Sequence, residues 1–128
     1  MLPHKDDLKN IAIEKSDTAL KSAEINIENN MLETALNRIY YSIFYIVSAL
    51  AYKHDFSTSK HSRLMGWFNQ KFVHEDKIFS QEIAKTYGDA FEYRQKSDYN
   101  FLYVPTVQEV KHILADVKEF IENIKKVI

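Results

Sequence analysis

The stretch FEYRQKSDYN, residues 91–100, places a pair of opposite charges where a helix should meet its core. Arg94 and Asp98 continue, at the same spacing, an apolar helical face that runs up to them. That face comprises Ile83, Tyr87, Ala90 and Phe91. In one explanation the two residues form an exposed i,i+4 ion pair, worth about 0.3–0.5 kcal/mol. In the other, Arg94 lines a polar cleft at the end of a bundle and Asp98 orients its guanidinium, whose planar fork of N–H donors fits a phosphate.

Two further polar residues interrupt apolar surfaces of predicted helices. His61 shares the inward arc of its helix with Leu64. A lone histidine on such a face is usually a hydrogen-bonded core residue, although imidazole also serves as an acid or base near neutral pH. Arg38 precedes Tyr41 at the edge of another apolar surface and is either a surface arginine or part of a site. Periodicity alone leaves open whether Arg38, His61 and Arg94 converge.

Other kinds of site are not indicated. The sequence has no cysteine, and it contains no Gly-rich phosphate loop, Ser/His/Asp signature or zinc motif. His4, His54, His74 and His112 show no metal-ligand spacing, so we expect them to be exposed. We therefore predict neither a metal nor a cofactor.

The elements that must position these residues are helices. The 128 residues include only 2 Gly and 2 Pro, and this length suits one domain with a single core. Amphipathic periodicity predicts five helices, at about residues 5–29, 31–53, 60–73, 80–97 and 106–127. Because the long helices are joined by short connections, we predict an all-α, antiparallel up-and-down four-helix bundle with an additional short helix, in a single domain spanning residues 1–128.

Helix ends are marked by capping residues. Asn30 with Glu33, and Thr106 with Glu109, have the spacing of a capping box, and Ser80 is a further predicted N-cap. The connecting segments are expected at residues 54–60, 73–79 and 98–105.

The predicted second helix is apolar nearly all round. One of its rows consists of Tyr41, Tyr45 and Tyr52. A helix without a polar face is either central to a bundle or also part of a subunit interface, where tyrosine is favoured. We therefore expect a homodimer formed through this aromatic helix.

Charge and hydropathy limit the remaining options. The net charge is −1, from 17 Lys+Arg against 18 Asp+Glu, so any contact with RNA must be local. The most apolar run, residues 39–52, is too short to span a membrane, and MLPHKDDLKN is not a signal peptide. We expect a cytoplasmic protein without membrane contact.

Three segments together resemble a known family. ALNRIYYSIFYIVSALAYKH, SKHSRLMGWFNQKFV and KIFSQEIAKTYGDAFEYRQKSDYN are similar to the HEPN domain, the higher-eukaryote and prokaryote nucleotide-binding domain, and in particular to its small stand-alone prokaryotic members. The resemblance covers roughly residues 5–125. It implies a helical bundle that is commonly dimeric and often encoded beside a minimal nucleotidyltransferase, as toxin and antitoxin. Several members are metal-independent ribonucleases.

The resemblance also implies roles for individual residues. Arg94 matches the motif arginine that binds the scissile phosphate, but Tyr99 occupies the position five residues later where the family has its catalytic histidine. Tyrosine, with a usual pKa near 10, is a poor general base, and Gln95 replaces the acid or amide of many active members. His61 matches a histidine of the stand-alone subgroup and would have to supply the missing acid or base.

Three functions follow as hypotheses. The first is a nucleotide- or RNA-binding module that uses Arg94, Asp98, Arg38 and Tyr41 and is paired with a minimal nucleotidyltransferase. A partner of that kind would also find the Tyr99 hydroxyl accessible for modification. The alternative is a metal-independent ribonuclease toxin with Arg94, His61 and Tyr99 as its catalytic residues. The third is a purely structural dimer in which Arg94 and Asp98 form an ordinary ion pair.

Overall fold

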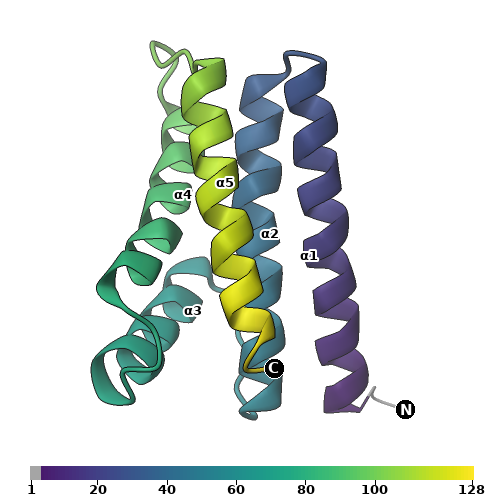
Figure 1. Cartoon of the computed structure of the whole chain (residues 1–128), viewed down its shortest axis with the longest axis vertical. Coiled ribbons are helices and arrows are strands. Elements are labelled where there is room, and N and C mark those ends of the chain that lie inside the picture. The colour runs from purple at the N-terminus through teal and green to yellow at the C-terminus, as the bar shows by residue number, and fades with distance from the viewer. Residues whose placement is uncertain (1–3) are drawn as a thin grey trace.

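The computed structural model describes residues 4–128 and confirms the all-α prediction, because no strand occurs among these residues. Residues 1–3, which belong to the N-terminal stretch without a signal-peptide pattern, lie outside the described residues. In chain order the elements are α1 (Lys5–Glu28), α2 (Leu32–Lys53), α3 (His61–Phe68), the π-helical segment η1 (Asn69–Glu75), α4 (Gln81–Tyr99) and α5 (Val107–Lys125). The helices α1, α2, α4 and α5 run alternately up and down side by side, and α3 lies at one end of the bundle (Figure 1).

Helix α2 is the central helix, and this position explains its apolar character. It contacts α1, α3, α4 and α5. Three apolar residues of its rows, Leu36, Ile43 and Leu50, are at most 1% exposed, and no large apolar residue within Leu32–Lys53 is strongly exposed. Burial inside the chain therefore accounts for most of the surface that also suggested a subunit interface. The half-buried residues of α2 include the row of Tyr41, Tyr45 and Tyr52.

Small residues let α1 approach α2 closely. The buried positions of α1 are Ala12, Ser16, Ala19 and Ala23. The Ser16 hydroxyl donates a hydrogen bond to the Ser42 carbonyl oxygen at 2.7 Å, which satisfies a buried polar group across the two helices. An amphipathic pattern includes the three alanines but not Ser16, because a serine is not counted as apolar.

An aromatic cluster closes the bundle beside α3. The Phe68 ring lies 5.6–6.0 Å from the rings of Phe72, Phe79, Tyr87 and Phe120. The predicted loop at residues 73–79 is partly wrong, since the chain stays helical to Glu75. The wider i,i+5 winding of η1 keeps Phe68 and Val73, five residues apart, both in the core.

Two of the three predicted caps are confirmed. The Ser80 hydroxyl accepts from the Ile83 amide, and Thr106 with Glu109 forms a complete capping box. The capping box at Asn30 is wrong. Asn30 adopts a left-handed conformation with φ 56°, which turns the chain between α1 and α2, so Met31 becomes the N-cap residue. Asparagine tolerates positive φ better than most residues.

The C-terminal end of α4 extends further than predicted. Asp98 and Tyr99 belong to its last turn rather than to the irregular segment that follows. Within residues 4–128, no helix has both the length and the apolar character needed to cross a membrane.

The close packing of α1 on α2 is testable by overpacking. Ala23→Leu should lower the free energy of unfolding by about 1–3 kcal/mol, because a fully buried alanine leaves no room for three additional carbons. Urea denaturation monitored by circular dichroism measures this change. Lys21→Leu, at an exposed position of the same helix, serves as the control and should change stability by less than about 0.5 kcal/mol. Equal effects of the two variants would contradict the packing described.

Candidate functional site

The candidate site is built on two adjacent tyrosines near the middle of α2. Tyr40 is fully buried and Tyr41 is half-buried, and their rings meet edge-on with centroids 5.4 Å apart. Helix α4 covers this part of α2, and the Phe91 ring packs edge-on against Tyr40 at 5.8 Å. The tyrosines therefore lie where the apolar face of α4 passes over α2, and not at the end of the bundle.

Arg94 follows Phe91 on the same face of α4 and lies over both tyrosines. The central carbon of its guanidinium is 5.1 Å from the ring centroid of Tyr40 and 5.4 Å from that of Tyr41. Only 19% of the side chain is exposed. An arginine can occupy an apolar face in this way because its guanidinium is attracted to aromatic faces and is weakly hydrated.

Asp98 pairs with Arg94 without using its hydrogen-bonding capacity well. The Arg94 Nε atom lies 3.2 Å from Asp98 Oδ2, so the two charges form an i,i+4 ion pair. The Nε–H is nevertheless buried without a hydrogen-bond partner in the described part of the chain, because it does not point at the carboxylate. Arg94 is thus held in place by stacking and charge, and no hydrogen bond within residues 4–128 uses the N–H donors of its two Nη nitrogens.

His61, at the start of α3, completes the site from the opposite side. Its Nδ1 atom lies 2.7 Å from the Tyr40 hydroxyl oxygen. Its ring stacks on Phe44 with centroids 4.4 Å apart and meets Tyr41 edge-on at 5.6 Å. Tyr40 therefore contacts both His61 and Arg94, which brings two of the predicted catalytic residues to one buried side chain.

The protonation states of this pair follow from burial and charge. Burial, and secondly the positive charge of Arg94, lower the pKa of His61 below its usual 6.5. Burial raises the pKa of the Tyr40 hydroxyl, and Arg94 only partly opposes this increase. At neutral pH His61 is therefore uncharged and Tyr40 keeps its proton.

The hydrogen bond between them also assigns the tautomer of His61. We expect the buried Tyr40 hydroxyl to donate its hydrogen to His61 Nδ1, its partner within residues 4–128, because a hydroxyl that only accepted would leave its own hydrogen unpaired. Because Nδ1 accepts, the single proton of the neutral imidazole resides on Nε2. His61 then presents an N–H donor to a ligand rather than a proton acceptor.

Arg38 adds a second cation beside Tyr41. Its guanidinium carbon lies 5.0 Å from the Tyr41 ring centroid, and its Nε and Nη2 atoms donate to the Asn37 side-chain oxygen at 3.1 and 2.8 Å. The amide of Asn37 is neutral, so it orients Arg38 without cancelling its charge. We call the set formed by Arg38, Tyr40, Tyr41, His61, Arg94 and Asp98 the Arg94 cluster.

Tyr99 is not brought into the Arg94 cluster. Five residues correspond to a rotation of roughly 140° around an α-helix, so Tyr99 projects from a different side of α4 than Arg94 does. Its side chain is 73% exposed. Tyr99 instead begins an exposed apolar segment, Tyr99–Val104, in which Phe101 is 100%, Leu102 91% and Val104 78% exposed.

Tyr40 is the member of the cluster that was not predicted as a site residue. Tyr40 lies in an otherwise apolar row of α2. A buried tyrosine hydroxyl usually has a hydrogen-bond partner, so a tyrosine in such a row is the sequence signal that could have identified it. His4, His54, His74 and His112 are exposed, as expected. No group of three or more His, Cys, Asp or Glu that could hold a metal occurs among the described residues.

Comparisons with known proteins bear on the whole chain. A sequence model of the HEPN domain matches residues 10–127. A Thermotoga maritima protein named UPF0332 protein is 38% identical over 109 residues, which cover 85% of this chain and 82% of that protein. Two Methanocaldococcus jannaschii proteins are also similar. Putative toxin MJ0142 is 29% identical, over 98% of this chain and 84% of that protein. Putative toxin MJ0605 is 31% identical, over 91% of this chain and 85% of that protein.

The assignment of the His61 tautomer can be checked by nuclear magnetic resonance. In ¹⁵N-labelled protein near neutral pH, His61 Nε2 should have the chemical shift of a protonated nitrogen and Nδ1 that of a hydrogen-bond acceptor, with a titration midpoint below 6.5. Tyr40→Phe removes the hydroxyl while it keeps the ring, and should yield a mixture of tautomers. A protonated Nδ1 in the unmodified protein would overturn the assignment.

Proposed function

Because this chain belongs to the HEPN domain family, we propose that it is a nucleotide- or RNA-binding module, formed by one domain over residues 1–128, in which the Arg94 cluster holds a phosphate. The observation that carries the proposal is Arg94 itself. Its guanidinium is fixed over two tyrosine rings and beside Asp98, yet no hydrogen bond within residues 4–128 uses the N–H groups of its two Nη nitrogens. The planar fork of donors that is left in this way fits the oxygens of a phosphate.

The charge balance of the cluster supports an anionic ligand. Arg38 and Arg94 contribute two positive charges beside Tyr41, and Asp98 contributes one negative charge. The rest of the protein is close to neutral, so binding relies on these local charges.

The tautomer of His61 favours binding over cleavage. Attack by a ribose 2′-hydroxyl requires a group that accepts its proton, and the Nε2–H of His61 is a donor instead. In this state His61 would donate a hydrogen bond to a phosphate oxygen beside Arg94. We therefore assign His61 and Arg94 to phosphate binding.

A protein partner is the second part of the proposal. Two relatives are named putative toxins. The exposed apolar segment Tyr99–Val104 is the kind of surface that marks a protein-binding site. It follows Asp98 directly, so a protein bound there would lie beside the Arg94 cluster and obstruct it. We propose a toxin-like protein whose partner, a minimal nucleotidyltransferase, docks on this segment, where it would also reach the Tyr99 hydroxyl.

A metal-independent ribonuclease is the second candidate function. The observation in its favour is that Arg94 and His61 both contact Tyr40. In that reaction the 2′-oxygen attacks phosphorus, the bond from phosphorus to the 5′-oxygen breaks, and the products are a 2′,3′-cyclic phosphate and a 5′-hydroxyl. It requires His61 to adopt its other tautomer when RNA binds, so that Nε2 takes the 2′-hydroxyl proton and then returns it to the 5′-oxygen as that oxygen leaves.

The homodimer through α2 stays a prediction, and its contact surface would be the row Tyr41, Tyr45 and Tyr52. Sedimentation should then report twice the 15.1 kDa of a single chain. Tyr52→Arg should shift the protein toward the single-chain mass, since it places a charge in the interface without touching the Arg94 cluster. A single-chain mass at all concentrations would exclude this dimer.

Binding and cleavage can be separated in one experiment. We expect fluorescently labelled single-stranded RNA to bind in EDTA without being cut, and Arg94→Ala to weaken binding about tenfold or more, as for a lost charged hydrogen bond. Fluorescence anisotropy measures binding, and a denaturing gel of the same samples measures cleavage. Lys111→Ala, which removes an exposed cation of α5, is the control and should bind normally.

Two outcomes would change the assignment. Equal binding by the unmodified protein and Arg94→Ala would remove Arg94 from the site. Cleavage by the unmodified protein, lost in both Arg94→Ala and His61→Ala, would replace the binding function with the ribonuclease.

A further inference from the structure

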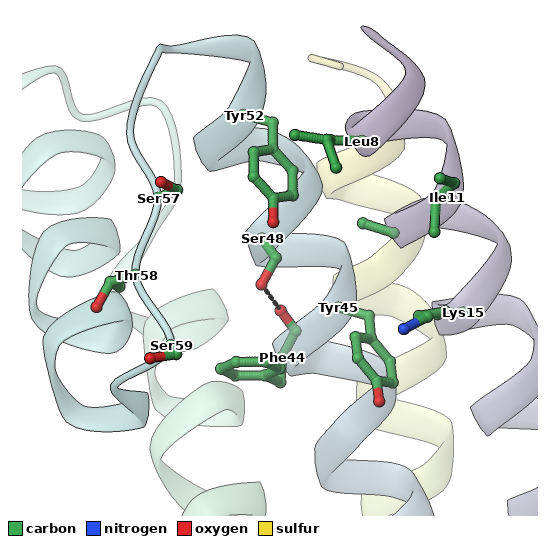
Figure 2. Close-up of a pocket in the computed structure, with 11 residues that line it drawn as sticks. Leu8, Ile11, Lys15, Phe44, Tyr45, Ser48, Tyr52, Ser57, Thr58 and Ser59 are labelled. Atoms are coloured by element: carbon green, nitrogen blue, oxygen red, sulfur yellow. Dashed lines mark hydrogen bonds between the residues drawn. The ribbon is translucent and has the colours of Figure 1, made fainter. Parts of the chain in front are cut away.

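A hollow of about 420 Å³ lies over the outer face of α2, between α1 and the connector that joins α2 to α3 (Figure 2). This volume falls within the ~300–1,000 Å³ typical of small-molecule sites. Six hydroxyl groups line it, those of Tyr45, Ser48, Tyr52, Ser57, Thr58 and Ser59. Apolar walls come from Leu8 and Ile11 of α1 and from the ring of Phe44.

The hydroxyl groups retain most of their hydrogen-bonding capacity. Ser48 donates to the Phe44 carbonyl oxygen at 2.7 Å and so can still accept. Thr58 accepts from the Lys60 amide at 3.1 Å and so can still donate. None of the hydrogen bonds within residues 4–128 uses the hydroxyls of the remaining four residues. The hollow therefore offers both donors and acceptors beside aromatic rings.

Lys15 is the single charged residue among those that line the hollow, and no carboxylate lines it. Its Nζ atom lies 5.6 Å from the ring centroid of Tyr45, and Figure 2 shows its side chain directed toward that ring. The site thus combines flat apolar surfaces, hydroxyls of both polarities and one cation. A planar ring with donors and acceptors on its edge, attached to an anion, matches this combination, whereas an aliphatic ligand would leave the hydroxyls unused.

We propose that this hollow binds the base of a nucleotide, with Lys15 on its phosphate. The inference deepens, and rests on, the proposed function of the Arg94 cluster. Phe44 connects the two sites, because its ring lines the hollow and also stacks on His61 at 4.4 Å. An RNA strand whose phosphate is held by Arg94 then places a neighbouring base beyond Phe44, and the protein recognises at least two consecutive nucleotides.

The experiment uses nucleoside monophosphates as probes and ribose 5-phosphate as a probe without a base. Titration into ¹⁵N-labelled full-length protein should shift the amide signals of Ser57, Thr58 and Ser59. The nucleoside monophosphates should bind about tenfold or more tightly than ribose 5-phosphate, because each stacked base contributes on that scale.

A matched pair of variants tests the location. Ser48→Leu fills the hollow with a good helix former and should weaken binding of the monophosphates about tenfold or more, whereas Ser48→Ala keeps the space and should bind within about twofold of the unmodified protein. Far-UV circular dichroism and thermal unfolding check that both variants fold. Binding by Ser48→Leu equal to that by Ser48→Ala would overturn the proposal.

The two sites fail in distinguishable ways. Arg94→Ala should weaken binding of RNA, whereas the shifts at residues 57–59, which report on the hollow and not on the Arg94 cluster, should persist. One outcome would overturn the base site and leave the Arg94 cluster in place. In it, Arg94→Ala weakens RNA binding, Ser48→Leu does not, and the amide signals of residues 57–59 do not shift. The base site and the homodimer predicted above compete for Tyr45 and Tyr52, which line the hollow. A second copy of the chain packed on these two residues would therefore overturn the base site. Shifts at residues 57–59 with RNA binding insensitive to Arg94 would instead remove the Arg94 cluster.

Discussion

The organisation of the site depends on a single buried side chain, Tyr40. Its ring carries the guanidinium of Arg94 from α4, and its hydroxyl bonds to His61 at the start of α3. Donation of this hydrogen bond requires the hydroxyl to keep its proton, and burial favours the protonated form by raising the pKa of Tyr40. Tyr40 of the central helix thereby positions Arg94 on α4 and His61 on α3. Its hydrogen bond also determines which nitrogen of the His61 ring carries the proton.

The Arg94–Asp98 pair illustrates how a charge can be kept within an apolar face. An unpaired guanidinium there would be destabilising, and an ordinary aliphatic residue would pack equally well over the tyrosines. The ion pair at 3.2 Å and the two aromatic contacts make the arginine tolerable without using its donors fully. The proposed phosphate site gives a reason for this arrangement, because the Nη donors of Arg94 are left for a ligand.

Much of the fold can be predicted from the sequence, because helical periodicity, the Ser80 cap and the Thr106–Glu109 capping box are local signals. The wrong prediction at Asn30 arises because asparagine favours two different conformations at a helix end. It can act as an N-cap, or it can adopt a positive φ in a turn, as it does here before α2. Spacing of four residues places Arg94 and Asp98 on one side of α4. It does not indicate which helix faces them, so the partnership of Tyr40 with His61 becomes visible only after packing. The hollow is less predictable still, since its hydroxyls come from α2 and from a connector without periodicity.

The small number of cations at the two proposed sites has a consequence for how RNA binding would respond to ionic strength. Arg38, Arg94 and Lys15 are the positive residues at the two proposed sites, in a chain of net charge −1. Each phosphate neutralised on a single strand contributes about −0.7 to the slope of log K against log salt concentration, so three contacts amount to a slope of about −2. Proteins with basic faces release many more counterions and dissociate steeply as salt rises. Stacking and hydrogen bonds would dominate here, and the complex would keep much of its affinity at salt concentrations that strip such proteins from RNA.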